Sequence, residues 1–247
     1  MYTETEGIIL RQIKAASGRR MILLLSKKYG KISAGTSISE RSRNKSALAL
    51  NPFTLGRYEL FKGRDSYSIN GAETINSYYS IGEDIDKFAA ASVALELSDK
   101  LLEEDQPASG MFNLLSEFLS LLEARKSDYG TLLTGFRIKA LVLSGSGMQV
   151  DACVRSGKTE DLRWISVPDG GAVCEECITQ ADQLNPLIFE VSNDIISVTR
   201  FMQSHPLRSL EKLSVPDRVQ QRLVKILRAY YSYHLGIDAL KSESLII

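Results

Sequence analysis

Residues 6–53 read EGIILRQIKAASGRRMILLLSKKYGKISAGTSISERSRNKSALALNPF, and this stretch decides the fold that we expect for the N-terminal part of the chain. Three short apolar runs, at 8–13, 21–25 and 31–35, lie between clusters of Lys and Arg. Apolar runs of this length, bounded by glycine and polar residues, are typical of β-strands. The stretch therefore predicts a small β scaffold that holds a basic surface outward.

The strand pattern continues through the first 80 residues. Asn51 and Pro52 mark a break, and the next run, 53–62, ends at Gly63. Asn70 and Gly71 then separate two further runs, and this pair favours a type I′ turn, so a hairpin is expected there. Five or six short strands without room for helices predict a small barrel or sandwich.

From about residue 81 the apolar residues recur at intervals of three and four, which keeps them on one face of a helix. Helices are predicted at about 81–101, 109–122 and 129–143, with their apolar stripes in the core. Another helix is expected near 189–201. The last helix has Pro216 in its first turn and Gly236 at its end. Residues 148–183, which hold all three cysteines, are expected to be irregular.

Composition narrows the class of protein. The 247 residues are 44% hydrophobic and 24% charged, which is typical of globular proteins and excludes fibrous and disordered classes. No apolar run reaches the roughly 18–20 residues that span a bilayer, and the N-terminus MYTETEG lacks the pattern of a signal peptide. We therefore expect a cytoplasmic protein without a membrane association.

The formal net charge of zero conceals a division along the chain. Residues 1–80 hold 13 Lys and Arg against 6 Asp and Glu, a net charge of +7, so residues 81–247 carry −7. Such asymmetry favours a basic binding module joined to an acidic body, although a solvated surface with an accidental bias gives the same count. The candidate DNA-binding residues are Arg19, Arg20, Lys27, Lys28, Lys31, Arg41, Arg43 and Lys45.

Aromatic residues lie near these charges in the sequence. Tyr29, Phe53, Tyr58 and Tyr67 would stack single-stranded bases if they lay on a barrel face, and would belong to the core if they pointed inward. Strand register decides between the two, and the sequence does not reveal it.

The cysteines resemble a zinc knuckle with one ligand missing. Cys174 and Cys177 form one pair, and Cys153 opens the other, but Ser156 stands where the fourth sulfur is required. Structural zinc sites close with four Cys or His, and a neutral hydroxyl is a poor ligand. A metal-free, degenerate knuckle and a zinc site therefore both stay open. A catalytic zinc lacks support, since no H-x-E or H-E-x-x-H motif provides a base.

Several segments together resemble the RecO family of bacterial DNA repair and recombination mediators along nearly the whole chain. They are EGIILR at 6–11, LLLSKKYGK at 23–31, SRNKS followed by NPF, GFRIKALVLSG at 135–145, the CVRSG and GGAVCEEC knuckle, and YHLGIDALKS near the C-terminus. Their order and spacing carry the resemblance. Ser156 departs from the family pattern and puts zinc in doubt.

The resemblance implies an α+β multidomain fold. An N-terminal OB-fold β-barrel, residues 1–80, would precede a helical domain, residues 81–247, with the knuckle-like insertion at about 148–183. It further implies a protein that is not an enzyme and requires no cofactor. Such a protein would bind single- and double-stranded DNA without sequence specificity and anneal complementary strands. With RecR it would help to load recombinase onto DNA coated with single-stranded DNA-binding protein, in the cytoplasm and at the nucleoid.

The acidic, Phe-ended tail of the single-stranded DNA-binding protein would be a further partner, and Arg137 is the candidate for its carboxylate. Two other classes stay open on the sequence. One is an interaction scaffold whose barrel binds protein, and the other is a metal-dependent enzyme that uses the cysteines. RNA is an alternative ligand within the binding class, because a barrel that reads backbone and stacked bases need not exclude a 2′-hydroxyl.

Overall fold

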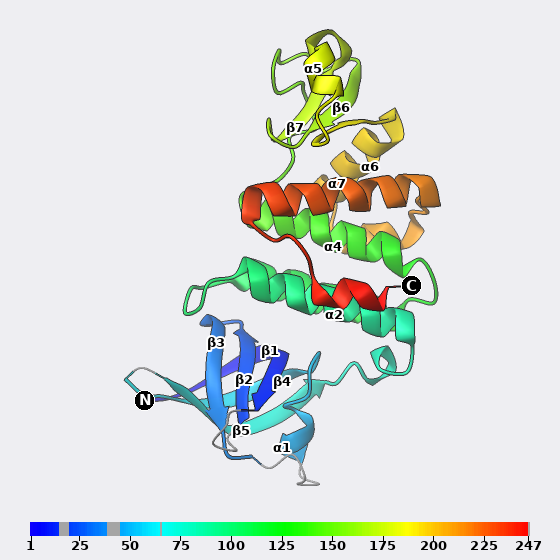
Figure 1. The fold of residues 1–247 in the computed structure, drawn as a ribbon. Coiled ribbons are helices and arrows are strands. Elements are labelled where there is room, and N and C mark those ends of the chain that lie inside the picture. The colour runs from blue at the N-terminus through cyan, green and yellow to red at the C-terminus, as the bar shows by residue number, and fades with distance from the viewer. Residues whose placement is uncertain (15–19, 39–44, 65, 247) are drawn as a thin grey trace. The chain divides into compact units, whose positions relative to one another are not determined.

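The computed structural model describes residues 1–14, 20–38, 45–64 and 66–246. Its chain divides into two compact units: residues 1–125 with 241–247, called unit 1, and residues 126–240, called unit 2. The domain boundary predicted near residue 80 coincides with the change from strands to helices, but two helices beyond it belong to unit 1 (Figure 1). The predicted boundary between two domains near residue 80 therefore stays a prediction.

Unit 1 begins with five strands that form a closed sheet in the order β1-β2-β3-β5-β4. The strands are β1 (Tyr2–Lys14), β2 (Arg20–Ser26), β3 (Gly30–Thr36), β4 (Leu55–Lys62) and β5 (Tyr67–Asn76), with the short helix α1 (Lys45–Leu48) between β3 and β4. β1 is long enough to pair with two neighbours, first with β4 and then with β2. A parallel pairing of β3 with β5 closes the sheet.

The interior of the barrel is apolar because alternate strand residues point inward. Its core consists of Ile9, Ile22, Leu24, Ile32, Ala34, Leu50, Tyr58, Leu60, Tyr67 and Ile69. The segment after α1 reaches this core, where the buried Tyr58 hydroxyl donates a hydrogen bond to the Ala49 carbonyl at 2.7 Å. Burial without a charged partner raises the pKa of Tyr58, so this hydroxyl stays protonated.

The hairpin predicted at Asn70 and Gly71 is wrong. β5 runs through both residues without turning, and its register against β4 shifts there, so that Glu59 faces Gly71 while Leu60 faces Ile69. Asn70 is the extra residue of this β-bulge. A Cβ at position 71 would lie 2.6 Å from Oε2 of the exposed Glu59, a flexible side chain that can move aside. The Asn-Gly pair therefore forms a β-bulge within β5 and not the turn of a hairpin.

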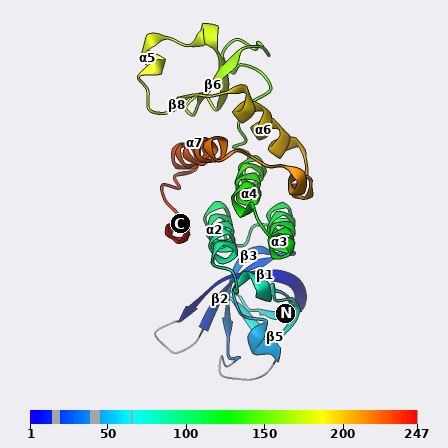
Figure 2. The ribbon, with the colours of Figure 1, turned by 90° about the vertical axis from the view of Figure 1, so that its right-hand side faces the viewer.

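Two helices complete unit 1 and lie side by side against the barrel (Figure 2). The first, α2 (Ile85–Leu101), is capped at its N-terminus by Asp84, whose carboxylate accepts hydrogen bonds from the amides of Asp86 and Lys87. The second is α3 (Ser109–Ala124). The 3-10 helices η1 (Tyr79–Ile81) and η4 (Lys241–Leu245) also belong to this unit. η4 is held by Glu96 of α2, which accepts hydrogen bonds from the backbone of Lys241 and Ser242.

Unit 2 combines helices with a small antiparallel sheet. Its elements are α4 (Tyr129–Leu143), β6 (Leu162–Ser166), β7 (Gly171–Cys174), η2 (Glu175–Cys177), α5 (Gln180–Gln183), β8 (Ile188–Glu190), α6 (Asn193–Ser204), η3 (Leu207–Lys212) and α7 (Asp217–Leu235). The predicted helix at 129–143 is confirmed. The helix expected near 189–201 is confirmed only from Asn193, where α6 begins, because Phe189 lies in β8. α7 ends at Gly236 with a positive φ of 64° as expected. The expectation of an irregular segment at 148–183 is wrong, because it contains two of the three strands in the order β7-β6-β8.

Candidate nucleic-acid interface and cysteine cluster

The structure divides the predicted basic residues between two ends of the barrel. Arg20 begins β2 and Lys27 follows its last residue, Ser26, so the two lie about 20 Å apart along the strand. Arg19, Arg41 and Arg43 lie outside the described residues, and Lys45 begins α1 while its side chain is outside the described part. The described candidates therefore do not form one patch.

Two of the candidates are used inside unit 1. Arg20 is only 8% exposed, and its guanidinium donates hydrogen bonds to the carbonyl of Ile38 and to Gln12 Oε1. Lys31 is 9% exposed, and its amine donates to the backbone carbonyl of Asp99 at 2.7 Å and to its carboxylate at 3.2 Å. Arg20 thus links β2 to β1 and to Ile38, and Lys31 links β3 to α2. Neither residue therefore offers its charge to a phosphate.

Lys27 and Lys28 do lie at the surface, at the turn between β2 and β3. Lys28 Nζ lies 5.3 Å from the centre of the Tyr29 ring, and Lys62 Nζ lies 5.8 Å from the same centre. Lys62 ends β4, so the closed sheet brings a lysine from another strand to this turn. Sequence reasoning missed Lys62, because only the register of β4 shows that it belongs here.

An exposed aromatic pair stands at the same end. Tyr2, 74% exposed, and Phe61 are directly opposite in the β1–β4 ladder, and their rings meet edge to face with centres 5.1 Å apart. We call Tyr2, Lys27, Lys28, Tyr29, Phe61 and Lys62 together the lysine–aromatic end. Of the aromatic residues weighed from the sequence, Tyr58 and Tyr67 lie in the core and Tyr29 is half-buried here.

Hydrogen bonds and positive charges surround Tyr29 at the lysine–aromatic end. A hydrogen bond with Thr3 at 2.7 Å, together with the charges of Lys28 and Lys62, lowers the pKa of Tyr29. Lys27 pairs with Glu6 at 2.8 Å in an exposed ion pair, which is a weak kind that a phosphate can replace. The cluster thus offers cations beside aromatic faces, the combination that binds the backbone and bases of single strands.

Arg137 is not placed at a surface. Its side chain on α4 is buried, with 3% of the residue exposed, and its backbone carbonyl accepts the hydroxyl of Tyr231 at 2.6 Å. Burial raises the pKa of Tyr231, which keeps this donor protonated. A carboxylate from another protein cannot reach the guanidinium in this conformation.

The three cysteines converge. Cys153, Cys174 and Cys177 place their ligand atoms within 4.8 Å of one another, and Cys153 Sγ accepts the amide of Cys174 at 3.3 Å. Ser156 Oγ lies 3.5 Å from Cys174 Sγ, so the hydroxyl is next to the three thiols. Three thiols fit three corners of a tetrahedral zinc site, and the serine makes the fourth corner weak.

Neighbouring charges hold the cysteine cluster in shape. Arg155 donates to Asp169 and Asp182, each at 2.7 Å, and to the carbonyl of Cys177 at 2.8 Å. Burial tends to raise the pKa of the Cys153 thiol, but hydrogen bonds from Ser156 and the Cys174 amide outweigh it and bring the pKa to about 6. A thiolate is therefore accessible near neutral pH, as metal binding requires.

Restoring the fourth thiol is expected to strengthen zinc binding. Ser156→Cys should lower the zinc dissociation constant by at least 10- to 100-fold, roughly what even outer-shell groups of metal sites contribute. Competition with a chromophoric chelator measures this constant for both proteins. Ser204→Cys, which adds a thiol at an exposed position of α6, is the matched control and should leave zinc affinity unchanged. Equal affinities of Ser156→Cys and the native chain would show that these four positions do not form a tetrahedral site.

Two family models together match nearly the whole chain. The model described as Recombination protein O N terminal matches residues 1–78, and the one described as Recombination protein O C terminal matches residues 82–244. The chain belongs to the RecO family. The resemblance inferred from the sequence is thereby confirmed.

Relatives named DNA repair protein RecO match nearly the whole length. The one from Alkaliphilus metalliredigens is 28% identical across 95% of this chain and 94% of its own. The one from a Thermoanaerobacter species is 29% identical across 98% of this chain and 96% of its own. RecO proteins are recombination mediators and not enzymes, and this membership supports a role in DNA repair and recombination. Among the described residues of this RecO protein, none of the helices combines the length and apolarity needed to cross a membrane.

Proposed function

We propose that this RecO protein binds single- and double-stranded DNA without sequence specificity through a barrel of the OB type. It would anneal complementary strands and, with RecR, help to load recombinase onto DNA coated with single-stranded DNA-binding protein. The observation that supports this most directly is the lysine–aromatic end, where Lys28 and Lys62 flank Tyr29. Family membership supports the repair role, and the positive N-terminal part supports the ligand.

Annealing follows from charge in this proposal. Two single strands repel each other through their phosphates, and each neutralised phosphate also releases condensed counterions. A protein surface that contributes several lysines lowers this repulsion, so complementary bases can meet and pair. Backbone contacts carry no sequence information, which makes the effect independent of sequence.

In this proposal DNA binds to unit 1. Its candidate contacts are the lysine–aromatic end together with Arg19, Arg41, Arg43 and Lys45. Arg20 and Lys31 are left out because both are buried in internal contacts. The tail of the single-stranded DNA-binding protein stays a proposed partner, but the buried Arg137 does not serve as its anchor. Action on DNA implies a place in the cytoplasm, at the nucleoid.

Fluorescence anisotropy of a labelled single-stranded oligonucleotide of arbitrary sequence tests the DNA-binding proposal. Affinity should fall as salt rises, because bound phosphates regain counterions. If four phosphates are engaged, affinity should fall roughly 50-fold between 50 and 200 mM salt. Two oligonucleotides of unrelated sequence should give the same curves. If the protein does not bind at low salt, the interaction scaffold is favoured. If it binds with an affinity that does not change with salt concentration, contacts to phosphates do not account for the binding.

A further inference from the structure

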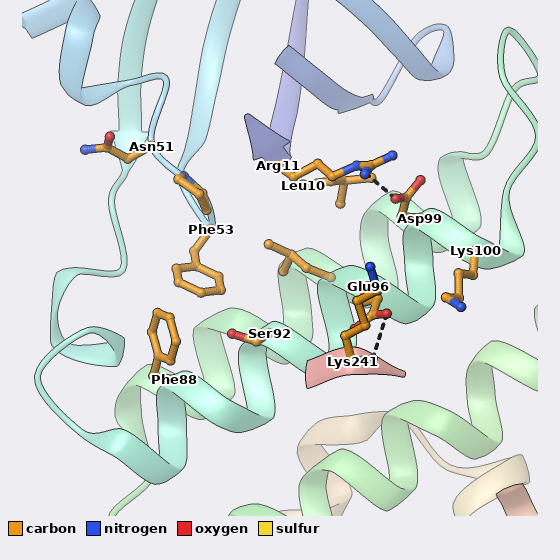
Figure 3. A pocket seen from close by; sticks show the side chains of 12 residues that line it. Leu10, Arg11, Asn51, Phe53, Phe88, Ser92, Glu96, Asp99, Lys100 and Lys241 are labelled. Carbon is orange, nitrogen blue, oxygen red and sulfur yellow. Dashed lines mark hydrogen bonds and ion pairs between the residues drawn. The ribbon is translucent and has the colours of Figure 1, made fainter. Parts of the chain in front are cut away.

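Unit 1 contains a cavity of about 850 Å³ that none of the proposed DNA contacts uses (Figure 3). It lies between α2 and the part of the barrel formed by β1 and the segment before β4, and its size is in the range of ligand sites. Phe53 and Phe88 lie at one end, with ring centres 5.5 Å apart and planes at 83°. Both rings are half-buried, so they contribute faces or edges to the cavity and are not closed off in the core.

The backbone at Phe53 is strained. Its φ is +70°, a left-handed conformation that costs a side chain about 1–2 kcal/mol and is rare for a bulky residue. Hydrogen bonds from Phe53 N to Ile9 O and from Ile9 N to Thr54 O hold this segment on β1. Strain of this kind concentrates at ligand sites, where the surrounding structure keeps a side chain in place. Here it directs an aromatic ring toward a cavity.

The other end of the cavity is charged. Arg11, Lys100 and Lys241 contribute three cations, against the carboxylates of Asp99 and Glu96. Asp99 is occupied by Arg11 at 3.2 Å and by Lys31 at 3.2 Å. Glu96 is occupied by the backbone amides of Lys241 and Ser242 and by the Ser242 hydroxyl. The acids are thus engaged within the protein, and the lining residue Lys241 is exposed.

We infer that this cavity takes one unstacked base of a single-stranded nucleic acid, an inference that rests on the proposed function. A nucleotide is aromatic at one end and anionic at the other. Phe53 and Phe88 match the base, and the positive charge of the lining residue Lys241 matches the phosphate. A purely apolar ligand would match the two rings but not this charge.

This site gives the protein a preference for single strands. A base that is paired and stacked in a duplex cannot enter the cavity without being flipped out, which costs unpairing energy. At the lysine–aromatic end, contacts to phosphates do not distinguish the two forms, and stacking of bases on its aromatic rings would add to the same preference. Removal of the cavity should therefore reduce the single-strand preference without abolishing binding.

The test compares two single-stranded oligonucleotides of equal length in the full chain: an all-thymine strand and a strand of abasic residues. Stacking on one aromatic site is worth about a factor of ten in affinity. Phe53→Gly should reduce the advantage of the thymine strand over the abasic strand about tenfold and leave abasic affinity within twofold. Glycine suits the positive φ, so the variant removes the ring while relieving the backbone.

A second variant fills the cavity instead of emptying it. Ser92 is a half-buried lining residue on α2, and Ser92→Trp should exclude the base and reduce the thymine advantage as Phe53→Gly does. Tyr79→Ala removes a 73% exposed aromatic residue of unit 1 outside the cavity and is the matched control, with the advantage retained. Melting followed by circular dichroism confirms that each variant is folded.

The outcomes separate this inference from the proposed function. Salt-dependent binding of both strands with equal affinity in the native chain would overturn the base site and leave the DNA-binding function standing. An unchanged thymine advantage in both folded variants would also overturn the site. Failure of the native chain to bind either strand at low salt would overturn the proposed function itself.

Discussion

Charge reversal of Lys28 and Lys62 together to Glu is expected to weaken binding of single-stranded DNA about 100-fold at moderate salt. Both amines lie beside the Tyr29 ring, at 5.3 and 5.8 Å from its centre, so the variant replaces two cations at one site by two anions. The loss should be the same for unrelated sequences, and the slope of log affinity against log salt should decrease by about 1.4. Anisotropy titrations at several salt concentrations measure both quantities.

A matched control separates a local contact from a change in net charge. Lys126→Glu with Arg163→Glu makes the same change at two exposed residues of unit 2 and should alter affinity much less. The sequence-based alternative, Arg41→Glu with Arg43→Glu, tests residues outside the described part of the chain. If that pair alone reproduces the full loss while the Lys28 and Lys62 variant binds normally, the lysine–aromatic end is not the DNA surface.

Gly30→Ala is expected to lower the free energy of unfolding of unit 1 by more than about 4 kcal/mol, near the limit for single substitutions. A Cβ at this position would lie 1.7 Å from the carbonyl oxygen of Gln106 and 2.8 Å from its carbon. The φ of Gly30 is +72°, which adds the cost of a left-handed residue. Since the obstacle is backbone and not a flexible side chain, the turn that carries Lys28 and Tyr29 would have to move. Urea denaturation followed by circular dichroism measures the loss.

Substitutions at two other glycines separate the cost of the positive φ from the cost of the clash with Gln106. Gly157 has a similar φ of +75°, and a Cβ added there would have nothing within 4 Å, so Gly157→Ala should cost only the strain, about 1 kcal/mol. Gly35 lies in β3, where a Cβ would have Met21 Sδ as its neighbour at 3.7 Å, and Gly35→Ala should change stability little. If Gly30→Ala lowers the free energy of unfolding no more than Gly157→Ala does, the Gln106 backbone moves to make room for the added Cβ.

Local sequence patterns predicted most of the secondary structure. Short apolar runs between glycine and polar residues marked the barrel strands, and the change to intervals of three and four marked α2, α3 and α4. Gly236 also marked the end of α7, because glycine readily adopts the positive φ found there. The patterns failed at Asn70-Gly71, because a dipeptide that favours a turn also suits a bulge, and only the pairing of β5 with β4 decides which forms. They also failed at β6 and β7, which are short and surrounded by glycine and polar residues.

The candidate site was predictable only in part. Lys27 and Lys28 are adjacent to a strand end and could be recognised as surface cations from the sequence. Lys62 and the Tyr2–Phe61 pair depend on the β1–β4 register, which joins residues about 60 positions apart. Arg20 and Lys31 are the same residue types in the same stretch, yet their burial against Ile38 and Asp99 removes them from the surface.

By itself, the sequence of this chain determined its family, its division into strands followed by helices, and the types of ligand atom gathered among its cysteines. These properties depend on residue order and short-range periodicity, which the chain carries before it folds. The tertiary structure alone decided which cations lie at the surface, that Phe53 is turned toward a cavity, and that Arg137 is enclosed. Such properties depend on the closure of the sheet and on packing between distant segments, where one residue of register reverses the side that a side chain faces.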